Sequence, residues 1–252
     1  MKIVFIGAGN LASSVAPALQ KAGQHIIQIY SRTTASAQQL ATILNCDFTT
    51  SADSIRQDAD IYIYAITDKN YPIDIVGSRQ ALHLLTSGSV PYTALRGAQH
   101  AGIFYPFQTF SKVQPVSNFQ DVPILIEASD NQSLLKTEEL AHCLSEKIYK
   151  STSESRARLH LAGVLANNFT NCLYALANEQ LEKADLPFDI LLPLIDETAH
   201  KVHLTTPRQA QTGPARRGDT DVMQKQLNLM PQELKEIYTI MSDNIIKNSN
   251  KL

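Results

Sequence analysis

The chain has 252 residues, of which 44% are hydrophobic and 18% charged, a composition typical of globular proteins and unlike disordered or fibrous ones. Its 22 lysines and arginines against 24 aspartates and glutamates give a net charge of −2, which does not favour nucleic acid or an anionic membrane as a partner. No stretch approaches the roughly 18 apolar residues that a membrane span requires, and the apolar run at 2–6 is too short for a signal-peptide core. We therefore expect a cytoplasmic protein with no membrane segment.

Cysteine and histidine spacing does not indicate a metal site. Cys46, Cys143 and Cys172 lie far apart and have no second cysteine at metal-ligand spacing, so we expect them to be buried apolar residues. His200 and His203 are three residues apart, but no third ligand accompanies them. We therefore expect His200 and His203 to be surface side chains near a helix C-terminus.

The first part of the chain alternates short β-branched runs with helix-like segments, which is typical of parallel strands joined by crossover helices. The expected strands are 2–6, 25–30, 60–66, 82–85, 102–107 and 122–127, and the expected helices are 11–22, 35–44 and 133–145. Several strands are apolar on both faces, so we expect helices to cover both sides of the sheet.

Beyond about residue 150 the strand pattern is replaced by helical periodicity. A capping box from Ser151 to Glu154 precedes a helix that extends to about residue 184. Helices at 188–203, 219–227 and 231–247 follow, with a loop at 205–218. The fold class is therefore α/β, a Rossmann-like doubly wound parallel sheet followed by an all-α C-terminal domain. We expect a dinucleotide-binding domain at 1–150 and a helical substrate and dimerisation domain at 151–252.

A glycine motif follows the first expected strand. Gly7 permits a tight turn, Gly9 lets a pyrophosphate approach the backbone, and Ala12 keeps the next helix close to the sheet. The free N–H groups at the helix start, around Asn10 and Leu11, then face the phosphates. The position between a strand and a helix favours a dinucleotide site over a glycine turn that serves packing alone.

The end of the second strand distinguishes NADP from NAD. An acid there would bond the ribose 2′-OH of NAD, whereas this chain has Ser31, Arg32 and Thr33, 24 to 26 residues after Gly7. A guanidinium and two hydroxyls can bind a 2′-phosphate, so we predict NADP as the cofactor. The alternative is that Arg32 is a solvated surface side chain.

Two more strand ends carry hydroxyls. Thr67 follows one expected strand and Ser87 another, and both should lie at the carboxyl edge of the sheet, where ligands bind in open α/β folds. Either could line the nicotinamide ribose. The alternative for each is a capping hydroxyl in a strand-to-helix turn.

The long helix carries a polar stripe of residues that recur every three or four positions: Arg156, His160, Gly163, Asn167 and Thr170 or Asn171. If this stripe faces the cleft between the domains, His160 could donate a proton, and the amides of Asn167 and Asn168 could bond a substrate carbonyl. We predict Asn167 and His160 as the catalytic residues and Asn168 as a substrate contact. The competing interpretation is a dimer-facing helix with satisfied polar groups.

Two adjacent arginines lie in the expected loop before Asp219, which should cap the next helix. One of them, Arg217, could bind a substrate carboxylate in a forked geometry. Alternatively, Arg216 and Arg217 anchor the loop to helix ends or to another subunit.

Taken together, these segments resemble the provisionally assigned NADP oxidoreductases that join a Rossmann-like domain to a C-terminal helical domain of unknown function. The resemblance rests on Gly7-Ala8-Gly9-Asn10, Leu85-Thr86-Ser87-Gly88-Ser89, Tyr105-Pro106-Phe107-Gln108-Thr109-Phe110, Leu159-His160-Leu161-Ala162, Asn167-Asn168-Phe169, Thr212-Gly213-Pro214 and Arg217-Gly218-Asp219. It covers nearly the whole chain and implies membership of the superfamily of 6-phosphogluconate dehydrogenase, β-hydroxyacid dehydrogenases, ketopantoate reductase and pyrroline-5-carboxylate reductase. In that superfamily the helical domains usually dimerise, so the resemblance implies a homodimer.

Two positions depart from the related families. The β-hydroxyacid dehydrogenases have a catalytic lysine four residues before an asparagine of this helix, and the corresponding position here is Gly163. Many members of the closer family have histidine where this chain has Tyr105, before Pro106. As a whole, the resemblance implies an NADP-dependent oxidoreductase acting on a small carbonyl or imine compound that bears a carboxylate. The alternative is a catalytically inactive NADP-binding regulatory or scaffold protein.

Overall fold

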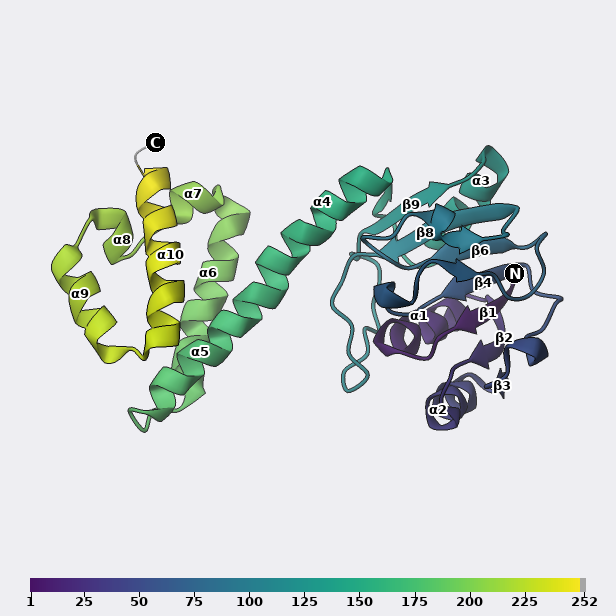
Figure 1. Ribbon diagram of the computed structural model, residues 1–252, viewed down its shortest axis with the longest axis horizontal. Helices are drawn as coiled ribbons and strands as arrows, with labels where there is room; N and C mark the ends of the chain where they lie inside the picture. The colour runs from purple at the N-terminus through teal and green to yellow at the C-terminus, as the bar shows by residue number, and fades with distance from the viewer. Residues whose placement is uncertain (250–252) are drawn as a thin grey trace. The chain divides into compact units, whose positions relative to one another are not determined.

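The computed structural model describes residues 1–249, which form two compact units (Figure 1). The first unit covers Met1–Asn167, and the second begins at Asn168. Within residues 1–249, no helix is long and apolar enough to cross a membrane.

The first unit is built on an eight-stranded sheet whose strands follow the order β10-β9-β8-β6-β4-β1-β2-β3. These strands are β1 (Lys2–Ile6), β2 (His25–Tyr30), β3 (Asp47–Thr49), β4 (Ile61–Tyr64), β6 (Leu82–Leu85), β8 (His100–Pro106), β9 (Ile124–Ala128) and β10 (Ile148–Lys150). Neighbours are parallel except for β8 and β9, which are antiparallel. The six expected strands are present, and the short edge strands β3 and β10 are additional to them.

Three helices cover one face of this sheet: α1 (Asn10–Lys21), α2 (Thr34–Leu44) and α3 (Asn131–His142). The chain moves outward from β1 through β2 to β3, and right-handed crossovers place α1 and α2 on the same side. Because β9 and β10 run in the opposite direction, the same handedness returns α3 to that side. The apolar faces of the three helices and of the sheet form one core.

The opposite face is covered without α-helices, which corrects the expectation of helices on both sides. From β3 through β4 and β6 to β8, the connections are 3₁₀ turns and a small ribbon of β5 (Ile73–Asp74) and β7 (Leu95–Arg96). Their apolar residues pack on Tyr62 and Tyr64, which are fully buried in β4. These segments form no α-helix, yet they protect the apolar face of the sheet. The predicted class, a Rossmann-like sheet followed by helices, is confirmed.

A long helical segment leads from the sheet into the second unit. It consists of α4 (Ser153–Gly163), a π-helix (Val164–Phe169) and α5 (Thr170–Glu182). The capping box at its start joins Thr152 and Ser155 rather than Ser151 and Glu154, a shift of one residue. The predicted helix is therefore present but contains a wider π turn, a feature common near functional sites.

The second unit continues with α6 (Leu192–Leu204), α7 (Pro207–Ala210), α8 (Pro214–Arg217), α9 (Thr220–Leu229) and α10 (Gln232–Ser249). The expected loop at 205–218 thus contains two short helices, each with a proline at its start. Asp219 caps α9 by accepting a hydrogen bond from the N–H of Val222, as expected. Cys172 is exposed, and Cys46 and Cys143 are half-buried, so the expectation that all three are buried is wrong.

Candidate functional site

The glycine turn at Gly7 joins three strands at the carboxyl edge of the sheet. Its φ of +114° is a left-handed conformation that favours glycine, and its N–H donates to the carbonyl of Tyr30 over 2.8 Å. A Cβ atom here would lie 2.3 Å from the carbonyl oxygen of Ala65. Gly9 then precedes α1 without a side chain to cap it, so the positive helix N-terminus is open to an anion.

A cleft of about 390 Å³ extends from this turn along the carboxyl ends of β1, β2 and β4. It is lined by Ile6, Gly7, Ala8, Gly9, Tyr30, Ser31, Arg32, Ala65, Ile66, Thr67, Asn70 and Ile73. The lining includes five of the residues predicted to bind the cofactor, Gly7, Gly9, Ser31, Arg32 and Thr67. It does not include Asn10, Leu11, Thr33 or Ser87. Asn10 and Thr33 directly follow lining residues, and Leu11 lies two residues after Gly9.

Arg32 lies at the mouth of this cleft, directly after β2. The backbone N–H of Ser31 donates to the carbonyl of Thr49 over 3.2 Å, which fixes the segment beside β3. Arg32 is exposed, and among residues 1–249 no carboxylate forms an ion pair with it. Its guanidinium is therefore available to a phosphate group.

Thr67 and Ser87 have different environments. The amide of Asn70 donates to the Thr67 hydroxyl oxygen over 2.6 Å, in the turn that follows β4 at the cleft. Ser87 is buried, and its hydroxyl oxygen accepts hydrogen bonds from the N–H groups of Ser89 and Val90, at 3.1 and 3.0 Å. The Ser87 hydroxyl thus stabilises the loop after β6 through hydrogen bonds to its backbone, which is the structural role of a capping hydroxyl.

A tyrosine–histidine pair lies at the carboxyl end of β8. The hydroxyl of Tyr105 is 3.0 Å from Nδ1 of His160 on α4. Burial raises the pKa of the Tyr105 hydroxyl, the carboxylate of Asp68 adds to this effect, and Arg156 opposes it. The hydroxyl therefore keeps its proton throughout the neutral range and is able to donate it.

Gly88 permits this pair to lie against the loop after β6. A Cβ atom at Gly88 would be 2.7 Å from Nδ1 of His160 and 2.8 Å from the Tyr105 hydroxyl. The adjacent Ser89 donates a short hydrogen bond to Asp68, which directly follows Thr67 of the cleft. A continuous set of contacts therefore connects the cleft to the tyrosine–histidine pair.

Arg156 positions α4 for this contact. It is fully buried, and its guanidinium pairs with Glu127 of β9 and donates to the carbonyls of Ser87 and Val90, at 3.2 and 3.1 Å. Because His160 is one helical turn further on, the anchored Arg156 directs it toward Tyr105. Of the predicted polar stripe, the structure thus brings Arg156 and His160 to the carboxyl edge of the sheet.

The rest of that stripe lies elsewhere. A Cβ atom at Gly163 would lie 2.8 Å from the ring of Phe107, so the lysine of the β-hydroxyacid dehydrogenases has no room here unless that ring moves. Asn167 and Asn168 are both exposed and belong to the π-helix. In α8, Arg217 is exposed. Among residues 1–249, no group of three potential metal ligands is close enough to hold an ion.

Sequence reasoning did not identify Tyr105, Gly88 or Glu127 as parts of this site. Tyr105 and His160 are 55 residues apart, and Arg156 and Glu127 are 29 apart. No local periodicity connects residues at such separations. The available signal was the glycine between two serines after a predicted strand, which indicates a close approach of other atoms.

Comparisons with known proteins agree with this description. Residues 2–81 match the family NADP oxidoreductase coenzyme F420-dependent, and residues 122–245 match a domain of unknown function, DUF2520. Among curated proteins, none matches the chain significantly. A crystal structure from Bacteroides fragilis, provisionally named an NADP oxidoreductase, is 42% identical, with a TM-score of 0.92 over 98% of both chains.

More distant structures share the fold alone. 1-Pyrroline-5-carboxylate reductase of Streptococcus pyogenes is 12% identical, with a TM-score of 0.63 over 100% of this chain and 99% of that one. The reductive aminase of Aspergillus terreus, in complex with NADPH, is 12% identical, with a TM-score of 0.62 over 99% and 87% of the two chains. The chain belongs to the family of NADP oxidoreductases in which a Rossmann-like domain precedes a DUF2520 helical domain.

Proposed function

We propose that the protein reduces a small carbonyl or imine compound bearing a carboxylate, with Tyr105 as the proton donor. The observation that carries this proposal is the 3.0 Å contact between the Tyr105 hydroxyl and Nδ1 of His160, at the carboxyl edge of the sheet. When bound, NADPH supplies a hydride to the substrate carbon. The substrate oxygen or nitrogen then gains negative charge, and a nearby proton donor stabilises it.

The residues of the cleft would hold the cofactor. The turn at Gly7 and Gly9, with the start of α1 at Asn10 and Leu11, would receive the pyrophosphate. Arg32, with the flanking hydroxyls of Ser31 and Thr33, would bind the 2′-phosphate. This arrangement supports the preference for NADP that the second strand end predicts.

The proton path follows from the pair itself. With Nδ1 protonated, His160 donates to the Tyr105 oxygen and leaves the phenolic proton free for the substrate. Tyr105 gives that proton to the substrate oxygen or nitrogen, and His160 stabilises the resulting phenolate. His160 then gives its Nδ1 proton to the phenolate while its Nε2 takes up a proton from water, which returns both side chains to their neutral forms. Asn167 and Asn168 remain proposed substrate contacts, and Arg217 remains a proposed carboxylate ligand.

A rival function has a specific observation in its favour. Phe107 occupies the space where the lysine of the β-hydroxyacid dehydrogenases would project from Gly163. A protein that kept the NADP site but lost catalysis would bind NADPH and reduce nothing, and would act in regulation or as a scaffold.

Replacing Tyr105 tests the proposal. Wild-type protein is screened for NADPH oxidation with a panel of 2-oxo acids and cyclic imines, and Tyr105→Phe is assayed on each active compound. We expect turnover to fall about 100-fold or more, because general acid catalysis is lost, with NADPH binding unchanged. Tyr149→Phe, an exposed tyrosine on β10, is the matched control. Full turnover in Tyr105→Phe contradicts the role of Tyr105, and NADPH binding without reduction of any compound supports the rival.

We also propose that the protein is a homodimer joined through the helical unit. Among residues 168–248, only Ala215 and Ser242 are buried. Large apolar side chains such as Leu173, Leu194 and Leu204 are 38%, 63% and 72% exposed. Such exposed apolar surface is typical of subunit interfaces.

A further inference from the structure

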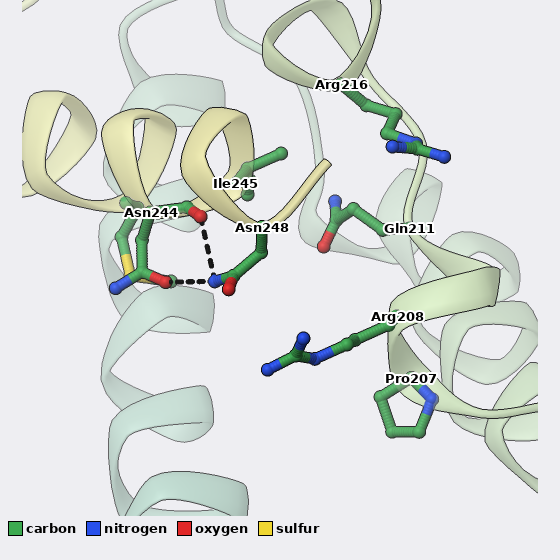
Figure 2. A pocket seen from close by; sticks show the side chains of 8 residues that line it. Pro207, Arg208, Gln211, Arg216, Asn244, Ile245 and Asn248 are labelled. Atoms are coloured by element: carbon green, nitrogen blue, oxygen red, sulfur yellow. Dashed lines mark hydrogen bonds between the residues drawn. The ribbon is translucent and has the colours of Figure 1, made fainter. Parts of the chain in front are cut away.

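The helical unit contains a pocket of its own, about 380 Å³ in volume, which is within the range of small-molecule sites. Its walls come from α7, α8 and α10, and it is lined by Pro207, Arg208, Gln211, Arg216, Met241, Asn244, Ile245 and Asn248. None of these residues takes part in the proposed hydride transfer. Figure 2 shows the side chains of Arg208 and Gln211 extending toward Asn248 on α10.

The lining includes Arg208 and neither an aspartate nor a glutamate. Arg208 is exposed to the pocket, and within the described part of the chain no carboxylate pairs with it. A guanidinium presents a planar fork of N–H donors, which suits a carboxylate.

The remaining lining is both ordered and apolar. The amide of Asn248 donates to the backbone and side-chain oxygens of Asn244, at 2.9 and 2.7 Å, which fixes this polar edge of the pocket (Figure 2). Pro207, Met241 and Ile245 provide the apolar surface. A bare inorganic anion would use Arg208 alone, whereas an aliphatic chain would also bury this apolar surface.

We propose that this pocket binds a small monocarboxylate with a short aliphatic chain. The carboxylate pairs with the guanidinium of Arg208, and the chain packs against Met241. This assigns a ligand site to the helical unit that is separate from the cofactor cleft and its chemistry.

Titration of the full-length protein with pentanoate tests the proposal, with NMR signals of the Met241 methyl group and the arginine side chains as the readout. We expect saturable shifts with a dissociation constant of about 1 mM or tighter. Neutral pentanamide, which has the same aliphatic chain, should bind at least about tenfold more weakly than pentanoate. Inorganic phosphate should also bind at least about tenfold more weakly, because it leaves the apolar surface exposed.

Arg208→Gln should weaken pentanoate binding about tenfold or more, and Lys225→Gln, which removes a charge from exposed α9, should leave it unchanged. NADPH binding, measured in parallel, should be the same in both variants. The proposal is overturned if pentanamide or phosphate binds as tightly as pentanoate. It is also overturned if Arg208→Gln binds pentanoate as the wild type does, or if the shifts do not saturate. Because these readouts do not depend on turnover, their failure is distinct from failure of the proposed reductase activity.

Discussion

Arg32 is the side chain on which the proposed choice between NADPH and NADH depends. We expect Arg32→Asp to weaken NADPH binding by about 1.5 to 3 kcal/mol, because a charge-assisted bond to the 2′-phosphate is replaced by repulsion. Fluorescence titration with NADPH and NADH measures the change. Arg79→Asp, the same charge reversal at another exposed site of this unit, should have no effect. An unchanged preference in Arg32→Asp would remove Arg32 from the phosphate site.

Gly88 offers a test of geometry that does not alter a titratable group. The Cβ of Gly88→Ala would push apart Nδ1 of His160 and the Tyr105 hydroxyl, both of which are ends of movable side chains. We therefore expect a folded protein with thermal stability near that of the wild type and intact NADPH binding. Turnover should fall about 100-fold, because displacement by about 1 Å is enough to disrupt proton transfer. Wild-type turnover in Gly88→Ala would mean that the pair does not act in the reaction.

Helix α3 depends on a charged cap whose effect changes with pH. Asp130 accepts hydrogen bonds from the hydroxyl and N–H of Ser133, at 2.6 and 2.8 Å, and these bonds hold the pKa of its carboxyl well below the ordinary value. Asp130 also lies 3.2 Å from Nδ1 of His100. Because the pKa is lower in the folded state, the stabilisation is complete above the unfolded pKa of about 3.9 and is lost as pH falls below it.

Two variants separate the cap from the charge. Asp130→Ala should lower the free energy of unfolding at neutral pH by about 1 kcal/mol, because the helix loses its cap. Asp130→Asn should retain most of the cap, and its stability difference from wild type should shrink as the pH is lowered through about 4. Urea unfolding at several pH values measures both. A difference that grows toward acid pH would contradict the assignment.

The two compact units differ in how well they bury their own apolar residues. The sheet unit has two clusters of nearly inaccessible side chains, one on each face of the sheet. The helical unit, over residues 168–248, buries only Ala215 and Ser242. A helical unit of this kind needs additional contacts to remove its apolar surface from water, and a second copy of the chain would supply them.

Light scattering at micromolar concentration tests the homodimer, and we expect twice the mass of the chain. Leu194→Glu, on α6 in the helical unit, should shift the population toward monomer, because a charge in an apolar interface is costly. Leu135→Glu is the matched control, since Leu135 is 62% exposed on α3 and Leu194 is 63% exposed. A wild-type protein with the mass of one chain would exclude the homodimer.

The sequence alone determined the features that arise from local periodicity and turn chemistry. The strands β1, β2 and β6 were predicted with the bounds that the structure has, because each is an apolar run ended by turn residues or by the glycine motif. Gly7 and Gly9 were identified because a strand and a helix flank them, and Asp219 because a capping aspartate precedes a helix.

Only the tertiary structure decided the features that depend on contacts between distant segments. The edge strand β10 is three residues long and takes its conformation from pairing with β9, so its own pattern could not reveal it. The crossover directions decided which sheet face receives helices. The proposed catalytic pair also depends on contacts between distant segments. Arg156 and His160 share a helix face by sequence, but their partners Glu127 and Tyr105 come from separate strands that only folding brings to that helix.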